Sequence, residues 1–483
     1  MKVFTSLASI REAIIINQIT LPELIQYYLD NIESKKHLNA FTEVYATEAL
    51  DQAAIIQEKI DSNNAGMLAG MVIGIKDLLC HEGHSLQSGS KILEGFKSQF
   101  TATAIQRLLD EDAIIIGRQN CDEFAMGSSN EHSVYGPVKN AANEAYVPGG
   151  SSGGSAVAVQ ADMCLASIGS DTGGSVRQPA AFCGVIGLKP SYSRISRYGL
   201  SAYGSSFDCI GPITKSVADA ALLLQVMAGA DEYDSTVSEQ NVPNYTNRKS
   251  LDKPLKIAYI KGTITGEGID EEIGTQTQQV LDKLEAEGHT VQAVDFSLTE
   301  YLLPVYYILT TAESSTNLSR FDGVRFGISE GRAQGLESMY KRTRSVGFGA
   351  EVKKRIMLGT FVLSEGYFDA YFTQAQKVRR LIRDETKEIL EKYDFIIAPT
   401  TPTPAFKLNS HDRDPLQMYL EDILTVQASL AGMPAISLPN GSSRAGLPIG
   451  IQVIANSFEE EKLLSFSDLL LENFIEGQPI QMT

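Results

Sequence analysis

The sequence has no tryptophan, few histidines and a shortage of positive charge. Its 483 residues include 6 histidines, and 41 Lys and Arg stand against 59 Asp and Glu, which gives a net charge of -18. Surfaces that bind RNA or DNA are normally basic, so this chain is not expected to bind nucleic acid over its whole surface. We expect any contact with RNA to be local or to be made by a partner.

The sequence also lacks paired cysteines, a leader-peptide pattern and long apolar runs. Its 5 cysteines are widely spaced and form no C-x-x-C pair, which is typical of the reducing cytosol. The first residues do not combine a charged start, an apolar core and a small-residue cleavage site. No run of about 18 uncharged apolar residues is present, so no transmembrane segment is expected. These absences predict a cytoplasmic protein.

Helical and strand patterns alternate along the chain. The capping-box pattern Thr20-Leu21-Pro22-Glu23 begins one helix, and a helical period continues over residues 46–60. Apolar runs of strand length occur at 71–79, 113–120, 255–262, 289–296, 394–402 and 434–455. This alternation predicts an α/β fold with a large mixed β-sheet covered by helices on both faces. We predict a single domain over residues 1–483, with a helical N-terminal portion of about residues 1–60.

Two clusters of glycine and serine lie between Pro148 and Gly184, separated by a short helical pattern and an apolar strand. Glycines let backbone N–H groups approach a bound group closely, and serine hydroxyls serve as nucleophiles, proton relays or hydrogen-bond donors. Because only one helix and one strand join the clusters, they can face each other across a pocket. This stretch is therefore interpreted as the frame of an active site.

Several familiar serine and phosphate motifs fit this frame poorly. The phosphate-binding pattern G-x-x-x-x-G-K-[ST] is absent, which argues against nucleotide binding by this chain. The segment Gly149 to Gly153 matches the nucleophile elbow G-x-S-x-G, for which His289 or His411 could be the histidine. That interpretation leaves the second cluster unexplained.

Two other patterns lie upstream of the frame. Ser88 to Lys91 fits S-x-x-K, but the S-D-N and K-T-G motifs that accompany it in penicillin-recognising enzymes are absent. His81 and His84 lack a second ligand pair for a metal, so a solvated loop is the better interpretation. No metal site is predicted.

Serine chemistry with a lysine base remains. A lysine in an apolar pocket loses its preference for the charged form and can accept a proton near neutral pH. Three lysines follow apolar, strand-like runs: Lys76, Lys189 and Lys261. The alternative for each is a lysine whose charged end reaches solvent at the end of a strand. The residue pattern alone does not choose among the three.

A resemblance to a known family chooses among these three lysines. GGSSGGSA at 149–156 and GSDTGGSVRQPAAFCG at 169–184 resemble the signature of the amidase signature family, and Lys76 in GIKD matches that family's lysine. Within the family, the chain is most similar to the subunits that hydrolyse glutamine in tRNA-dependent amidotransferases. The segments that carry this likeness begin with NCDEFAMGSS, YYILTTAESS, FGAEVKKRIM and DILTVQASLA. The likeness covers essentially the whole chain and implies the amidase signature fold.

The resemblance also implies roles for single residues. Ser175 would be the nucleophile, Ser151 a bridging serine on a cis peptide bond, and Lys76 the base at the end of the relay. Backbone N–H groups of the oxyanion hole would come from Thr172, Gly173, Gly174 and Ser175. Residues that orient the triad would be Ser152, Asp171 and Arg177. For each of these residues the alternative is a turn-forming or structural role.

Substrate-binding residues follow from the same resemblance. The family's glutamine pocket falls on Tyr306, Arg355 and Asp422. Arg355 could grip the α-carboxylate, while Asp422 accepts from the α-ammonium group. Ordinary ion pairs are the alternative. Gln427 departs from the family, which commonly has proline there, and this departure leaves the wall near Asp422 open to question.

The resemblance implies a glutaminase that supplies ammonia for converting Glu-tRNA(Gln) to Gln-tRNA(Gln). Its partners would be a B subunit, which binds the tRNA and uses ATP and Mg²⁺, and a small C subunit, in a heterotrimer. No cofactor is expected in this chain. A stand-alone amidase acting on another amide is the main alternative, and a catalytically silent scaffold protein is the second.

Overall fold

The computed structural model describes residues 3–475 except 249–250, 252–253, 332–334 and 411–414. Its strands are β1 (Phe41–Val44), β2 (Val72–Lys76), β3 (Ile114–Gln119), β4 (Ala166–Asp171), β5 (Ile186–Lys189), β6 (Cys209–Thr214), β7 (Lys256–Ile260), β8 (Thr290–Val294), β9 (Phe395–Pro399), β10 (Ala435–Ser442) and β11 (Pro448–Ile454). The predicted strands are all present. Strands β1 and β6 were not predicted: β1 has only 4 residues, and Gly211 and Pro212 interrupt the apolar residues of β6.

The α-helices lie between these strands. They are α1 (Leu7–Ile15), α2 (Leu21–Ser34), α3 (Ala46–Asp61), α4 (Thr103–Asp110), α5 (Gly153–Gln160), α6 (Arg177–Cys183), α7 (Val217–Met227), α8 (Gly262–Thr265), α9 (Glu271–Ala286), α10 (Leu302–Asn317), α11 (Leu336–Gly347), α12 (Ala350–Val362), α13 (Gln374–Lys392), α14 (Pro415–Leu420), α15 (Val426–Ala431) and α16 (Glu460–Asn473). In the N-terminal portion, β1 interrupts the helices that were predicted.

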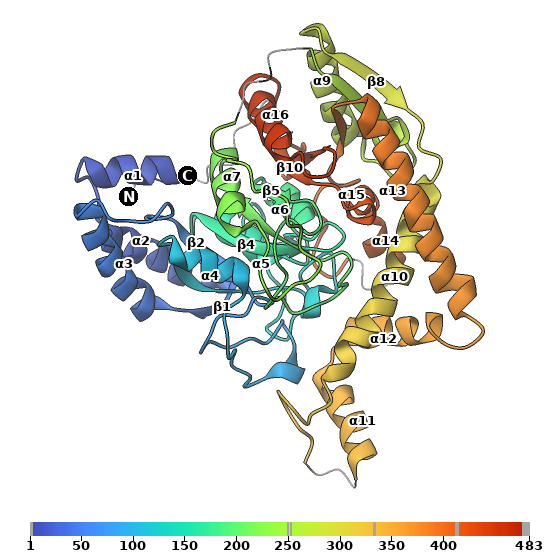
Figure 1. Cartoon of the computed structure of the whole chain (residues 1–483), viewed down its shortest axis with the longest axis horizontal. Coiled ribbons are helices and arrows are strands. Elements are labelled where there is room, and N and C mark those ends of the chain that lie inside the picture. Colours follow the sequence, from blue (N-terminus) through green and yellow to red (C-terminus); the bar gives the residue numbers. More distant parts are fainter. Residues whose placement is uncertain (1–2, 249–250, 252–253, 332–334, 411–414, 476–483) are drawn as a thin grey trace.

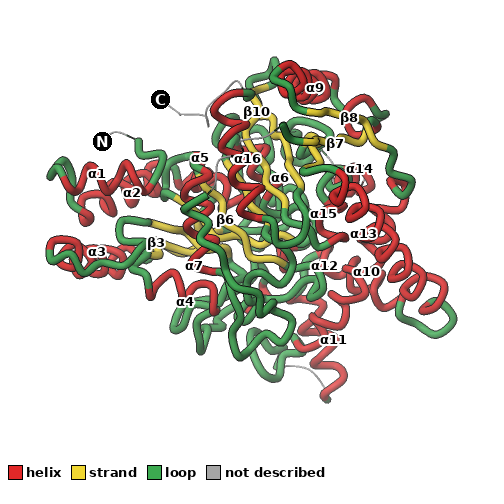
Figure 2. The backbone as a smooth tube through the Cα atoms, turned by 45° about the horizontal axis from the view of Figure 1, so that its top comes forward, coloured by secondary structure: helices red, strands yellow, loops and turns green. Residues whose placement is uncertain are grey.

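One mixed sheet of 11 strands runs through the molecule in the order β1-β3-β2-β4-β6-β5-β10-β11-β9-β7-β8. Strands β3, β2 and β4 are parallel neighbours, as are β9, β7 and β8, whereas the strands in the middle pair antiparallel. Helices cover both faces of this sheet, as the alternating pattern predicts (Figures 1 and 2). The mixed sheet therefore joins the N-terminal and C-terminal halves of the chain.

The N-terminal helices show why the local sequence signals were reliable. Helix α2 begins at the predicted capping box: the Thr20 side chain accepts from the Glu23 N–H, and the Glu23 side chain accepts from the Thr20 N–H. The apolar face of α2 is buried through Leu24, Ile25 and Tyr28. A local pattern with both a start signal and an apolar face thus predicts where the helix begins and which face it buries.

Helices α10, α12 and α13 lie together at one end of the sheet, where Figure 1 shows them in yellow and orange. Helix α10 packs against α12, α13 and α15, and a small core that includes Leu309, Ile382 and Val426 lies between these helices and the C-terminal strands. This layer brings α10, with Tyr306, over the loop that leaves β4. It positions one wall of the site described below.

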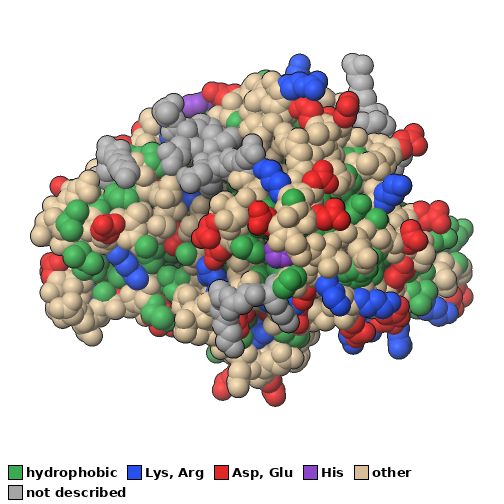
Figure 3. All heavy atoms as spheres, turned by 90° about the horizontal axis from the view of Figure 1, so that it is seen from above, with side chains coloured by type: hydrophobic (Ala, Val, Ile, Leu, Met, Phe, Trp, Pro, Cys, Tyr) green, Lys and Arg blue, Asp and Glu red, His purple; other side chains and the backbone are tan. Residues whose placement is uncertain are grey.

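The surface is mixed in charge. On the face shown in Figure 3, acidic, basic and hydrophobic side chains are interspersed, and the Lys and Arg side chains drawn there form no continuous patch. Among the helices that the structure describes, none is both long enough and apolar enough to cross a lipid bilayer.

Candidate active site

The first glycine-serine cluster forms the turn that enters helix α5. Ser151 and Ser152 are completely buried there, and the peptide bond between Gly150 and Ser151 is cis, as the resemblance implied. A Cβ atom at position 150 would lie 2.1 Å from Asp122 Oδ2, so only glycine fits against that carboxylate. The turn therefore needs its glycine in order to place both serines at the start of α5.

Lys76 is the last residue of β2 and points its amine at these serines. Its Nζ atom lies 2.7 Å from Ser151 Oγ, 2.8 Å from Ser152 Oγ and 3.0 Å from Ser170 Oγ. Burial lowers the pKa of Lys76 to about 8, because no solvent stabilises the charged form. Burial also lowers the pKa of Lys189, so it is the hydrogen bonds to serines that distinguish Lys76 among the three candidate lysines.

The other two lysines lie elsewhere. Lys189 ends β5, and its Nζ donates to the carbonyl of Pro190 at 2.9 Å. Lys261 precedes the short helix α8 and is exposed. Among the described residues, neither lysine forms a hydrogen bond with a serine of the two clusters.

The second cluster leaves β4 at Asp171 and turns into helix α6. Ser175 lies in this turn with 8% of its surface exposed, whereas Ser151 and Lys76 have none. Within the described chain, the N–H groups of Thr172, Gly173 and Ser175 donate to no protein acceptor. The Gly174 N–H is already taken, because it donates to Asp171 Oδ1 at 2.9 Å. Three of the four expected oxyanion donors are therefore available for a ligand.

The two clusters contact each other through their backbones. The Ser152 N–H donates to the Ser175 carbonyl at 3.2 Å. In the described part of the chain, no hydrogen bond joins the hydroxyls of Ser151 and Ser175. Such contacts often tighten only when substrate is bound. The backbone contact places the two turns side by side, and Ser175 is more exposed than Ser151.

A buried ion pair holds the second cluster in shape. Arg177 donates to Asp171 through Nε at 3.0 Å and Nη2 at 2.9 Å, and both side chains are completely buried. Burial alone would raise the pKa of Asp171, but the Arg177 guanidinium outweighs that effect and keeps the pKa below its ordinary value. Arg177 also donates to the Thr425 carbonyl at 2.9 Å and to Gln452 Oε1 at 2.6 Å. The pair therefore ties the Ser175 turn to the C-terminal strands.

Tyr306, on α10, lies directly over this turn. A Cβ atom at Gly173 would come within 2.4 Å of the Tyr306 hydroxyl, so the ring packs against bare backbone. Tyr306 is buried, and its ring meets Phe207 edge to face at 5.8 Å. It forms a wall beside the expected oxyanion donors.

Arg355 projects from α12 and is buried among aromatic rings. Its Nε donates to Glu351 Oε1 at 2.8 Å, and its Nη1 donates to the Tyr203 hydroxyl at 2.8 Å. Its guanidinium carbon lies 5.4 Å from the centre of the Tyr307 ring and 5.5 Å from that of Tyr419. Among the described residues its Nη2 has no partner, so a donor remains for an anionic ligand.

Asp422 lies beside Arg355 and is held by two hydroxyl groups. Ser128 Oγ lies 3.0 and 2.9 Å from the two carboxylate oxygens, and the Tyr307 hydroxyl donates to Oδ2 at 2.8 Å. Burial raises the pKa of Asp422 to about 7, while both hydroxyls and Arg355 act in the opposite direction. We call Arg355 and Asp422 the charged clamp. It carries one positive and one negative group in a buried setting.

His289, His81 and His84 do not join this site. His289 Nδ1 accepts from the Leu255 N–H at 3.0 Å, at the far end of the sheet, and His411 lies outside the described residues. His81 and His84 stack at 4.0 Å, and His84 pairs with Glu48 at 2.8 Å. In the described chain no group of His, Cys, Asp and Glu is arranged to hold a metal. The nucleophile elbow therefore lacks its histidine partner in the described structure.

Gln427 points away from the charged clamp. It lies on α15, and its Nε2 donates to Thr386 Oγ1 on α13 at 3.3 Å. The doubt that this residue raised about the wall near Asp422 is thus removed, since Gln427 contributes to the packing between two helices instead.

Sequence reasoning missed several residues that the structure brings to the site. Ser170 contacts Lys76 from inside β4, and its place in the signature segment was a usable signal. Ser128 and Tyr307 contact Asp422 from distant loops and helices. Both lie in segments that carry the family likeness, but nothing local pairs them with Asp422, because their roles depend on tertiary packing.

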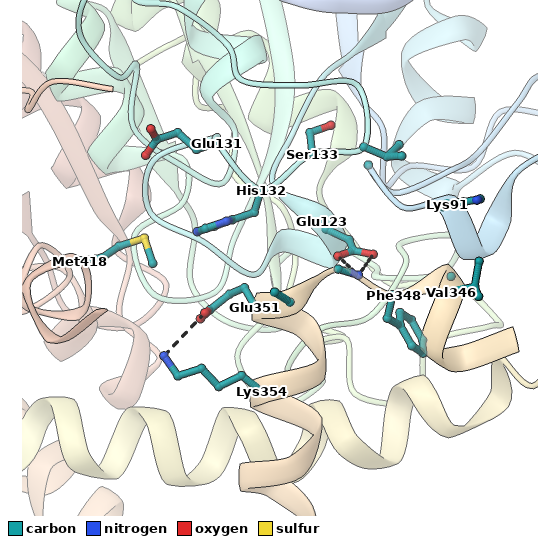
Figure 4. Close-up of a pocket in the computed structure, with 15 residues that line it drawn as sticks. Lys91, Glu123, Glu131, His132, Ser133, Val346, Phe348, Glu351, Lys354 and Met418 are labelled. Atoms are coloured by element: carbon teal, nitrogen blue, oxygen red, sulfur yellow. Dashed lines mark hydrogen bonds and ion pairs between the residues drawn. The ribbon is translucent and has the colours of Figure 1, made fainter. Parts of the chain in front are cut away.

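A pocket of about 510 Å³ opens beyond the clamp (Figure 4). Glu123, His132, Glu351 and Lys354 line it, and none of Lys76, Ser151 and Ser175 does. Because Glu351 separates this pocket from Arg355, the pocket borders the clamp from outside. The three triad residues therefore do not line this pocket.

Comparison with known proteins places these features in context. A family model described as amidase matches residues 23–464. The A subunit of glutamyl-tRNA(Gln) amidotransferase from Acidobacterium capsulatum is 51% identical, over 82% of this chain and 83% of that protein. The protein of the same name from Chlorobium phaeobacteroides (strain DSM 266) is 46% identical, over 98% of this chain and 100% of that protein.

Solved structures agree with these relatives. The crystal structure of the glutamyl-tRNA(Gln) amidotransferase A subunit from Thermotoga maritima is 37% identical, covers 96% of this chain and 98% of its own, and superposes with a TM-score of 0.77. Native peptide amidase from Stenotrophomonas maltophilia is 25% identical, covers 99% of each chain, and has a TM-score of 0.82.

Proposed function

This chain belongs to the amidase family, and from that premise we propose that it is the glutamine-hydrolysing component of a glutamyl-tRNA(Gln) amidotransferase. The relatives that carry this name match nearly the whole chain. The observation that carries the chemistry is the buried amine of Lys76 at 2.7 Å from Ser151 Oγ, next to the turn that holds Ser175. This arrangement supports amide hydrolysis by a serine nucleophile with a lysine as the base.

In the proposed reaction, Ser175 Oγ attacks the side-chain carbonyl carbon of glutamine. Its proton passes to Ser151, whose own proton passes to neutral Lys76. A neutral amine has two N–H donors and one lone pair. Ser152 and Ser170 are placed to accept from the two donors, which aims the lone pair at Ser151. Both serines therefore orient the base.

Negative charge then develops on the carbonyl oxygen. The N–H groups of Thr172, Gly173 and Ser175 supply the oxyanion donors in this proposal, while the Gly174 N–H stays with Asp171 unless the turn rearranges. When the tetrahedral intermediate collapses, the proton returns through Ser151 to the leaving nitrogen, and ammonia departs. Water attacks the acyl-serine through the same relay and releases glutamate.

The charged clamp would select glutamine among amides. No described residue accepts from Arg355 Nη2, which leaves this donor for the α-carboxylate, and Asp422 can accept from the α-ammonium group. Tyr306 would bound the same space next to Gly173. A pair of buried opposite charges suits a zwitterionic amino acid better than a neutral amide, because each charge of the ligand finds a partner.

The charge and motifs of this chain indicate which steps of the reaction belong to partner subunits. We propose that B and C subunits complete a heterotrimer in the cytoplasm, and that the B subunit binds the tRNA and uses ATP and Mg²⁺. The net charge of -18 supports tRNA binding by the partner. The absence of a phosphate-binding loop from the sequence supports ATP use elsewhere. This chain would supply ammonia.

A stand-alone amidase is the alternative, and the similarity to a peptide amidase favours it. The charged clamp supports glutamine hydrolysis over this alternative, because it offers a partner for each charge of a free amino acid. The test is purification of the chain with its native partners, followed by an assay for glutamine-dependent amidation of glutamyl-tRNA. Ser175→Ala should abolish amidation from glutamine and retain amidation from added ammonium. Amidation by the isolated chain with ATP, or none by the assembly, would refute the proposal.

A further inference from the structure

The loop of residues 121–130 reaches the start of the helix that carries Arg355. Glu123 accepts from the Gly349 N–H, with its two carboxylate oxygens at 3.1 and 2.8 Å, as the dashed lines in Figure 4 show. Gly349 precedes α12 and offers no side chain to cap it. The first N–H groups of a helix lack partners within the helix, so a carboxylate there fixes its first turn. Arg355 lies in the second turn.

The lack of a side chain at Gly349 allows Glu123 to lie close to the start of α12. A Cβ atom at position 349 would lie 2.3 Å from Glu123 Oε2, so glycine is what lets the carboxylate reach the helix. Glu123 is only 4% exposed, and Ser90 Oγ also donates to it. Burying a carboxylate is costly, which argues against an incidental surface contact.

The other end of the same loop reaches the second charge of the clamp. Ser128 Oγ lies 3.0 and 2.9 Å from the carboxylate oxygens of Asp422. Next to Glu123, the Asp122 N–H donates to the Ser151 carbonyl at 3.2 Å. One short loop thus contacts the triad, the Arg355 helix and Asp422.

We propose that the loop of residues 121–130 positions the charged clamp relative to the nucleophile. Glu123 acts on Arg355 through α12, and Ser128 acts directly on Asp422, so both are positioning residues. This inference rests on the proposed function, since it takes the clamp to hold glutamine. A clamp whose two charges are held in place binds its ligand more tightly than one that must be ordered on binding, which gives such a loop a clear task.

The experiment compares Glu123→Ala and Ser128→Ala in hydrolysis by the full-length chain with its co-purified partners. Three amides are used: glutamine, 4-aminobutanamide, which lacks the α-carboxylate, and glutaramate, which lacks the α-amino group. Each variant should raise the KM for glutamine about tenfold or more, as expected for losing a hydrogen bond to a charged group, with little change in kcat. The Glu123→Ala loss should vanish with 4-aminobutanamide, and the Ser128→Ala loss with glutaramate.

Two further variants guard against a simple folding defect. Gly349→Ala displaces Glu123 from the other side and should reproduce the Glu123→Ala pattern. Glu123→Gln keeps an oxygen that can accept from Gly349 and should restore most of the affinity. Ser133→Ala is the matched control, because it removes a hydrogen bond of 2.6 Å to Asn120 outside the clamp. It should leave KM unchanged.

The outcomes separate this inference from the proposed function. If the wild type hydrolyses glutamine but the variants lose activity equally on all three amides, or keep their KM for glutamine, the positioning role is wrong. If the wild type does not hydrolyse glutamine, both the proposed function and this inference are wrong. Selective losses, each cancelled by the matching truncated amide, establish the positioning role.

Discussion

Lys76 and Ser151 are completely buried, and the Nζ atom of Lys76 lies 2.7 Å from the Ser151 hydroxyl oxygen. Such a contact allows proton transfer only when the lysine is neutral. Burial brings its pKa down to about 8, from an ordinary value of 10.5. A substantial neutral fraction therefore exists near pH 8, and this relationship governs the first prediction.

Glutamine hydrolysis should weaken as pH falls below about 8, because Lys76 then gains a proton and can no longer act as base. This decrease at low pH should be visible in both kcat and kcat/KM. Lys76→Ala should lower kcat by about 10²–10⁴-fold or more at every pH. The measurement is a pH–rate profile of ammonia release. A nearly active Lys76→Ala, together with an inactive His289→Ala, would contradict the lysine mechanism.

Protonation of Asp422 should cause a second decrease at low pH, which should appear in kcat/KM but not in kcat. Its pKa of about 7 in the free protein means that it becomes protonated, and unable to bind the α-ammonium group, as pH falls below that value. Bound glutamine brings a positive charge that keeps Asp422 ionised, so kcat should not show this decrease. Asp422→Asn should raise the KM for glutamine and remove the second decrease. A second decrease that persists in Asp422→Asn must belong to another group.

Arg355→Ala should impair the use of glutamine without impairing the acceptor half of the reaction. The buried clamp would lose its partner for the α-carboxylate, and we expect kcat/KM for glutamine to fall by about 10²-fold or more. Amidation of glutamyl-tRNA from added ammonium, measured in the same assembled complex, should be unchanged. Equal losses with both nitrogen sources would show that Arg355 supports the assembly and not glutamine binding.

Gly173→Ala should abolish hydrolysis, because its Cβ would come within 2.4 Å of the Tyr306 hydroxyl and displace the Ser175 turn. Gly262→Ala is the matched control, since nothing lies within 4 Å of a Cβ placed there. Ammonia release and thermal unfolding of both variants check this expectation. An active Gly173→Ala with an undisturbed fold would argue against these N–H groups as oxyanion donors.

Arg177→Met should destabilise the protein strongly. Removing the guanidinium leaves the Asp171 carboxylate buried without its charged partner, which costs about 3–5 kcal/mol of unfolding free energy. Lys341→Ala is the control, because its pair with Glu337 is exposed and is worth at most about 1 kcal/mol. Urea denaturation compares the two. A small loss for Arg177→Met would mean that the pair is not needed to hold the Ser175 turn.

Much of the fold and of the reactive centre could be predicted from sequence. Helix α2 carries its own start signal and apolar face, so local physics determines it. The two glycine-serine clusters stand out because few other roles require so many small residues together. The choice of Lys76 over Lys189 did not follow from local pattern, because both end apolar strands. It came from family resemblance, and the hydrogen bonds of Lys76 agree with it.

The surroundings of the clamp could not be predicted. Ser128 and Asp422 are 294 residues apart in the chain, and Glu123 meets Gly349 across 226 residues. Periodicity describes single elements and says nothing of such pairings. The short edge strand β1 was missed for a similar reason: its 4 residues are stabilised by pairing with β3 more than by their own pattern.

The central claim is that glutamine acylates Ser175, and the most direct test is to locate the covalent adduct. The assembled protein would be treated with a diazoketone analogue of glutamine, digested and analysed by mass spectrometry. The account predicts modification of Ser175, protection by excess glutamine, and no modification in Ser175→Ala. An adduct on Ser151 or Ser152, with Ser175 unmodified, would contradict it.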